Sequence, residues 1–257
     1  MQPKNKKFFD LEPEDELFLT LMKLGHNFHY QDLAIQFGIG KSTASNVFIT
    51  WINLLCNVFK EINTWPTQAT ISNYEKFKGN DSDCTVIIDC TEFKIEKPTN
   101  PVAEQLTWSS YKNCNTVKVL VGISPNGGVT FISDAMGGSV SDRQIFEKCG
   151  IIDKLRYNDV ILCDRGFSVQ DLVAHKNVKA SMPSFIKKGM NQLKPEQMKQ
   201  SKRISSKRIH VERMMELGKT YEILNNQICT QLIKLAGHIV FVCFMLANLR
   251  LNIVHPL

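Results

Sequence analysis

Two aspartates stand at the ends of apolar runs, where a buried carboxylate needs a partner. Asp89 follows the run 86–88, and Asp164 follows the run 160–163. In open α/β sheets the strand ends form the crevice in which ligands bind, and two carboxylates on neighbouring strands could share a cation. Either aspartate alone is more simply interpreted as a turn residue that caps a helix or loop. The presence of both favours a cation site.

A Mg²⁺ or Mn²⁺ site with few other ligands needs a third acid, and Glu212 is the candidate. It lies in the helical stretch 208–217. Taken alone, Glu212 is more simply a surface residue paired with Arg208 four positions earlier. Residue type by itself therefore leaves two interpretations of Glu212.

Six motifs follow one another in the order and spacing of a known family. They are IIDCTEF (87–93), TWSSYKN (107–113), TVK (116–118), GGSVSDR (137–143), DRGF (164–167) and RIHVER (208–213). Together they resemble the DDE transposase domain of the Harbinger/PIF superfamily, particularly the animal branch often fused to THAP zinc fingers. The resemblance covers about residues 84–252, and the segment 14–55 resembles the helix-turn-helix that precedes this nuclease domain. No CxxC pair matches the family's zinc finger, so the chain is either a shorter member or part of a longer protein.

The resemblance implies an RNase H-like fold whose D-D-E triad falls on Asp89, Asp164 and Glu212. The implied activity is that of a metal-dependent DNA endonuclease or transposase that cuts phosphodiester bonds at transposon ends, or of a domesticated derivative. Two Mg²⁺ or Mn²⁺ ions would stabilise the attacking and leaving oxygens, the first between Asp89 and Asp164 and the second between Asp89 and Glu212.

The same resemblance implies the partners. Double-stranded DNA is the expected substrate, and a homo-oligomer is expected because two DNA ends must be cut together. A separate DNA-targeting protein would deliver the enzyme to chromatin, which places the expected location in the nucleus.

Two rival functions come from other classes. One is a catalytically silent DNA-binding or adaptor protein derived from a transposase, which the complete triad disfavours. The other is a metal-dependent phosphatase or hydrolase of small substrates, which the basic segment and the helix-turn-helix described next disfavour.

A basic segment precedes Glu212, and in that position phosphate contact is the favoured interpretation. A solvated helical face is the alternative. The positions predicted to contact DNA here are Lys187, Lys188, Lys202, Arg203, Lys207 and Arg208.

The N-terminal segment has the pattern of a helix-turn-helix. A helix begins at Pro13, a short helix covers 30–37, glycines stop it at 38 and 40, and a longer helix begins near Lys41. In this motif the last helix lies in the major groove of DNA. The predicted contacts are Lys41, Ser42, Ser45 and Asn46. An ordinary three-helix bundle with a polar third helix is the alternative.

The remainder of the chain predicts an α/β domain with a mixed RNase H-like sheet flanked by helices. The expected strands are 85–96, 116–123, 129–133, 160–164 and 180–182, the first three forming an antiparallel meander. Ser141 with Gln144 predicts a capping box, and Ser168 with Asp171 predicts another helix start. We therefore expect a small all-α domain over 1–70, a linker to about 83, and the nuclease domain over 84–257.

Composition agrees with these expectations. The chain has 257 residues, a formal net charge of +6 and a pI near 8.8, which suits a polyanionic partner. Its 8 cysteines form no CxxC pair, and we interpret them as reduced thiols of an intracellular protein. The apolar stretch 239–246 is shorter than the ~20 residues that cross a bilayer, so it predicts a buried C-terminal helix and no membrane partner.

Overall fold

The computed structural model describes residues 11–62, 64–67, 84–125, 127–164, 166–182 and 211–250. The N-terminal part is helical, and its elements match the predicted ones. These are α1 (Pro13–His26), α2 (Tyr30–Phe37) and α3 (Lys41–Glu61). Proline and three acidic residues fill the first turn of α1, where they complement the positive end of the helix dipole. Gly38 ends α2 with φ of 65°, a left-handed conformation that glycine adopts without strain.

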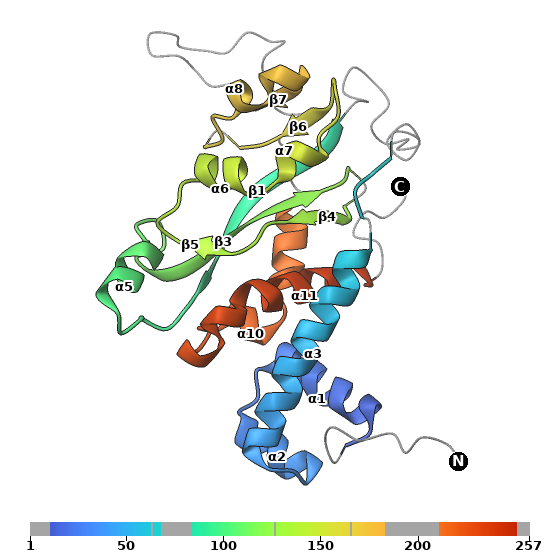
Figure 1. Ribbon diagram of the computed structural model, residues 1–257, viewed down its shortest axis with the longest axis vertical. Coiled ribbons are helices and arrows are strands. Elements are labelled where there is room, and N and C mark those ends of the chain that lie inside the picture. Colours follow the sequence, from blue (N-terminus) through green and yellow to red (C-terminus); the bar gives the residue numbers. More distant parts are fainter. Residues whose placement is uncertain are drawn as a thin grey trace.

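The described residues after 84 form one seven-stranded sheet flanked by helices (Figure 1). Its strands are β1 (Cys84–Lys94), β2 (Trp108–Ser109), β3 (Cys114–Ile123), β4 (Val129–Ile132), β5 (Met136–Gly137), β6 (Val160–Leu162) and β7 (Lys179–Ser181). The strand order is β2-β3-β1-β6-β7, with β4 and β5 also pairing along β3. The predicted fold class, a mixed α/β sheet with an N-terminal helical region, is confirmed.

The sheet is antiparallel on one side of β1 and parallel on the other. On the first side β1 pairs with β3, from Ile87 opposite Ile123 to Lys94 opposite Thr116. On the second side β6 runs parallel to β1, and β7 runs parallel to β6. Parallel neighbours need a crossover connection. The connecting helices are α6 (Asp142–Lys148) and α7 (Ile151–Lys154) before β6, and α8 (Gln170–Val173) with η2 (Ala174–Lys176) before β7.

Each face of the sheet is covered by its own hydrophobic core, and β1 contributes to both. Ile88 belongs to the core that contains residues of α6, α7 and α8. Ile87 belongs to the core on the other face, which contains α11 (Ala236–Asn248), α10 (Glu222–Asn225) and the helix over residues 211–219. Burial on both faces explains why β1 begins with a continuous apolar run.

Helix α3 extends from the N-terminal helices into the core that contains α11. Phe48, Ile52 and Cys56 are fully buried there together with residues of α11 and the sheet. A polar contact of 2.9 Å also joins Asn53 Oδ1 of α3 to His238 Nδ1 of α11. Figure 1 shows α3 crossing beside α11. The N-terminal helices are therefore anchored to the sheet region through a shared hydrophobic core.

The C-terminal helix is buried as the sequence predicts. Thr230–Asn248 is the one helical segment, among the residues that the structure describes, with the length and hydropathy of a membrane span. Its larger part, α11, buries eight of its residues, including Ile239, Val242 and Phe244. This burial accounts for the apolar composition of the segment.

The shared core yields a prediction about stability. Phe48→Ala should lower the free energy of unfolding by about 3–5 kcal/mol, because it leaves a cavity in the core that α3 shares with α11 and the sheet. Denaturant unfolding should still show one transition, since both regions depend on that core. Val58→Ala, at an exposed position of the same helix, should change the free energy by less than about 0.5 kcal/mol. Two separate transitions, of which only the first responds to Phe48→Ala, would contradict a shared core.

Candidate active site

The parallel pairing of β1 with β6 ends two residues before two of the predicted acids. Ile87 pairs with Leu162. Asp89 lies two residues further along β1, and Asp164 lies two residues beyond Leu162, where β6 ends. Both aspartates are half-buried. A cation shared by the two carboxylates stays a prediction.

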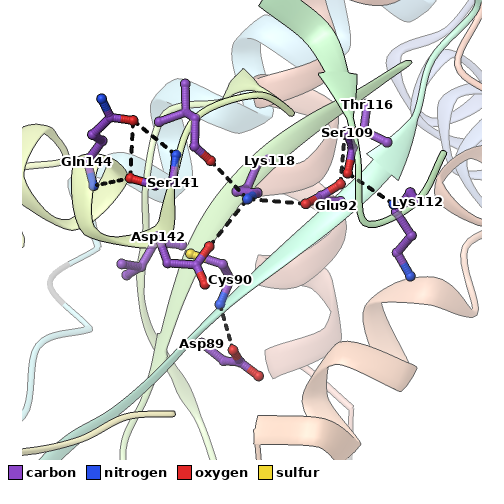
Figure 2. A network of polar contacts seen from close by, with 12 residues as sticks. Asp89, Cys90, Glu92, Ser109, Lys112, Thr116, Lys118, Ser141, Asp142 and Gln144 are labelled. Atoms are coloured by element: carbon purple, nitrogen blue, oxygen red, sulfur yellow. Dashed lines mark hydrogen bonds and ion pairs between the residues drawn. The ribbon is translucent and has the colours of Figure 1, made fainter. Parts of the chain in front are cut away.

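Side-chain alternation sets the face to which Asp89 is directed. Ile87 belongs to the core that contains α11, whereas Ile88 belongs to the opposite core. Since strand side chains alternate between faces, Asp89 is directed to the α11 side. The Cys90 N–H donates to Asp89 Oδ1 at 2.9 Å and orients that carboxylate (Figure 2).

The third predicted acid lies on a helix that packs into the α11-side core. Glu212 is exposed on the helix over 211–219, which packs into that core through Val211, Met214 and Met215. Among the described residues, no group of three or more histidine, cysteine, aspartate or glutamate side chains is arranged to hold a metal ion. The structure therefore does not assemble the three predicted acids into one metal-binding group.

The side-chain donors around Asp89 and Asp164 fit a hard divalent cation only in part. Carboxylate oxygens suit Mg²⁺ or Mn²⁺. Burial, assisted by Asp142, raises the pKa of the adjacent Cys90 thiol, which keeps it protonated and a poor ligand. Two oxygen donors could share one ion here, and the catalytic and metal-binding roles of Asp89, Asp164 and Glu212 stay predictions.

On the opposite face of β1, a buried lysine links two carboxylates (Figure 2). Lys118 Nζ lies 3.2 Å from Glu92 Oε1 and 3.3 Å from Asp142 Oδ1, and it donates to the Val140 carbonyl at 2.9 Å. Burial lowers the pKa of Lys118, but Asp142 and Glu92 raise it more, so its pKa lies above the ordinary value. The ammonium stays charged and its three protons have three acceptors.

Close backbone packing surrounds the lysine cluster, which consists of Lys118, Glu92 and Asp142. Thr116 Oγ1 donates to Glu92 Oε2 at 3.0 Å. A Cβ on Gly138 would come within 2.0 Å of Thr116 Oγ1 and 2.9 Å of the Thr107 carbonyl oxygen. Glycine is therefore required where the 137–143 motif crosses β3, and this crossing places Asp142 against Lys118.

The start of α6 in turn holds the loop that carries Asp164. Arg143 donates to the carbonyl of Ser168, and its guanidinium binds the Asp171 carboxylate at 2.5 and 2.7 Å. Asp142 Oδ2 lies 3.3 Å from where a Cβ on Gly166 would be. Both Asp142 and Arg143 thus contact the loop that follows β6.

One predicted helix cap in this region is wrong. The capping box of Ser141 with Gln144 is present at α6. The cap of α8 is not Ser168 but Val169, which makes no side-chain cap hydrogen bond. The Asp171 carboxylate is bound by Arg143, a residue distant in the sequence.

The four predicted helix-turn-helix contacts lie in the first turns of α3, and their contact with DNA stays a prediction. Lys41, Ser42 and Asn46 are exposed at the start of α3, and Ser45 is half-buried. The six basic positions predicted near Glu212 all lie outside the described residues. These are Lys187, Lys188, Lys202, Arg203, Lys207 and Arg208.

The lysine cluster was missed as a unit by sequence reasoning, although its motifs were recognised. One signal was available: Lys118 is the single charged residue within the apolar strand 116–123. Its partners could not be found locally, because Glu92 pairs with it only through the register of β1 and β3.

The described fold is a mixed α/β sheet flanked by helices and preceded by three N-terminal helices. Comparison with protein families identifies the class of protein. The model of the DDE superfamily endonuclease matches residues 88–248, and that of the helix-turn-helix of DDE superfamily endonuclease matches residues 9–61. The chain belongs to the DDE superfamily endonucleases. A search of curated proteins found no match.

Removing the lysine at the centre of its cluster should destabilise the fold. Lys118→Met leaves two carboxylates close together without a cation, and we expect a loss of about 3–5 kcal/mol in chemical denaturation. Adding Glu92→Gln should restore part of this loss. Lys94→Met, at an exposed position of β1, is the matched control. A change below about 1 kcal/mol for Lys118→Met would show that the cluster is not structurally important.

The Arg143–Asp171 pair predicts a pH dependence. The hydrogen bond from Arg143 lowers the pKa of Asp171 from 3.8 to about 2. Because the pKa is lower in the folded state, the stabilisation is present above pH 4 and is lost as the pH falls from about 4 to about 2. The difference in melting temperature between wild type and Asp171→Asn should shrink over this range. A constant difference between pH 6 and pH 2.5 would be the contrary result.

Proposed function

We propose that this protein is a divalent-metal-dependent DNA endonuclease of the transposase type. The observation that carries the proposal is the parallel pairing of Ile87 with Leu162, because Asp89 and Asp164 each follow that pair by two residues. Family membership supports it, since DDE superfamily nucleases generally use divalent metal ions. The rival hydrolase of small substrates has no comparable support.

Asp89 and Asp164 would hold the cation, and Glu212 would complete the set from the helix on the same face. The bound metal would supply charge stabilisation for the oxygens of the phosphodiester. The chain's own residues fix the carboxylates: the Cys90 N–H orients Asp89, and Arg143 holds the loop after Asp164.

DNA binding would be divided between two surfaces. Lys41, Ser42, Ser45 and Asn46 would contact the groove or its phosphates from the start of α3. The basic residues between 187 and 208 would neutralise phosphates near Asp89 and Asp164. The positive net charge of the chain favours both contacts.

The finer assignments extend the same proposal. The six motifs support the Harbinger/PIF branch, including its THAP-fused relatives. A nuclear location, a homo-oligomer that cuts two DNA ends and a separate DNA-targeting partner follow from that branch. A catalytically silent, DNA-binding derivative is the alternative, which retains the fold and the lysine cluster without cutting DNA.

Nicking of supercoiled plasmid in Mn²⁺ tests the proposal. Asp89→Asn should reduce the rate more than about 100-fold, because even changes beside metal ligands cost 10- to 100-fold. Asp153→Asn, at an exposed position on α7, should keep the wild-type rate. Mn²⁺ at 100 times its Kd should stabilise the wild type by about 2.7 kcal/mol and leave Asp89→Asn unaffected.

The outcomes separate the candidate functions. Wild-type protein that binds duplex DNA and Mn²⁺ without nicking would favour the silent derivative. Equal nicking by wild type and Asp89→Asn would exclude this carboxylate from catalysis. Hydrolysis of a small phosphoester with no action on plasmid would favour the rival hydrolase.

A further inference from the structure

Two aromatic side chains are exposed on the hairpin between β2 and β3. Tyr111 is 84% exposed and Trp108 is 41% exposed. The other tryptophans differ: Trp65 is buried, and Trp51 donates to Glu16 Oε2 at 2.7 Å. Single exposed apolar residues are common on protein surfaces. A role for this hairpin therefore requires further observations.

The first observation is that the hairpin backbone is firmly anchored. Trp108 pairs with Asn115, and Ser109 pairs with Cys114. Ser109 is buried, and its Oγ accepts the Lys112 N–H at 3.2 Å (Figure 2). Asn115 Nδ2 donates to the Glu104 carbonyl at 2.8 Å and to Thr107 Oγ1 at 2.9 Å.

Helix α5 (Pro101–Thr107) is fixed to the same unit. The Leu106 carbonyl accepts a hydrogen bond of 2.6 Å from Ser139 Oγ. The same carbonyl oxygen lies 2.1 Å from where a Cβ on Gly137 would be, so the 137–143 motif packs tightly on this helix. A rigid backbone presents the exposed rings, which lowers the entropy cost of binding a partner.

The second observation is the charge beside the rings. Lys112 Nζ lies 5.0 Å from the centroid of the Tyr111 ring. The carboxylate of Glu104 on α5 is engaged by Lys97 at 2.8 Å. An aromatic face beside a cation matches the two parts of a nucleotide, because bases stack on aromatic rings and phosphates bind cations.

The third observation is the distance to the candidate active site. The Ile95 N–H donates to the Asn115 carbonyl at 3.0 Å, and Asn115 is the strand partner of Trp108. Trp108 therefore lies level with Ile95, which is six residues after Asp89. Measured along the strand at 3.3 Å per residue, this separation is about 20 Å. With 3.4 Å per nucleotide of one strand, this span equals about six nucleotides.

We propose that Tyr111 and Trp108 form a stacking platform for unpaired bases of the DNA substrate, about six nucleotides from the bond that is cut. The proposal rests on the proposed endonuclease function and specifies how its substrate is held. A paired base hides its faces within the duplex, so only unpaired bases offer a face to the rings. Lys112 binds the adjoining phosphate, which favours DNA over an apolar protein surface as the partner.

Binding of two DNA molecules by the full chain tests this platform. One is a blunt duplex, and the other is the same duplex with an unpaired tail of ten thymidines. Tyr111→Ala should weaken binding of the tailed DNA about 5- to 100-fold and leave the blunt duplex unchanged, since stacking is lost only with unpaired bases. Tyr111→Phe should retain wild-type affinity. Tyr157→Ala, at another highly exposed tyrosine, is the matched control and should have no effect.

Tryptophan fluorescence provides a second readout. The tailed DNA should quench the emission of wild-type protein, and Trp108→Phe should remove that quenching while Trp51 and Trp65 continue to emit. If Tyr111→Ala binds the tailed DNA as tightly as wild type, the platform is refuted. Equal weakening by Tyr157→Ala would refute it as well, and so would a Tyr111→Ala change that alters only self-association.

The two proposals fail in different ways. Protein that binds neither DNA molecule refutes both the endonuclease function and the platform. Protein that nicks plasmid and binds blunt duplex, but shows no selective loss with Tyr111→Ala, refutes the platform alone.

Discussion

The pairing of β1 with two different neighbours is the constraint on which the candidate site depends. Antiparallel pairing with β3 and parallel pairing with β6 leave β1 buried on both faces. The parallel register aligns Ile87 with Leu162, two residues before Asp89 and Asp164, and side-chain alternation directs Asp89 to the side of α11. A shift of one residue in the pairing of β1 would turn Asp89 to the opposite face.

The opposite face of the same strand supports the site through a different kind of interaction. The Lys118 ammonium holds Asp142 against β1 and β3, and Arg143, the next residue, binds the loop after β6. A buried charge pair contributes little net stability but is costly to break. Its consequence here is positional: the helix start and the Asp164 loop are tied to the strand that carries Asp89. The α3 helix joins the DNA-binding motif to the core on the α11 side, so both functional regions share one framework.

Local patterns predicted much of this fold, and non-local contacts account for the rest. The bounds of α2 and the Ser141 capping box were predictable because caps and periodicity are properties of neighbouring residues. Five of the seven strands were also predictable from their apolar runs, whereas β2 and β5, of two residues each, were not. The partners of Lys118 and the Arg143–Asp171 pair depend on contacts between residues distant in the sequence. The insertion of Phe48 and its neighbours into the nuclease core could not be predicted, because one helix face packs equally well in a separate bundle.

The central claim is that Asp89 and Asp164 form a divalent-cation site. Localised cleavage of the protein backbone tests it most directly: Fe²⁺ is bound in place of Mg²⁺ or Mn²⁺, and peroxide then generates radicals that cut the chain near the metal. The account predicts cuts close to residues 89 and 164, suppressed by excess Mg²⁺ and absent from Asp89→Asn. Addition of DNA should produce a further cut near residue 212 if Glu212 joins the site. Cleavage elsewhere in the chain, or the same pattern in Asp89→Asn, would contradict the claim.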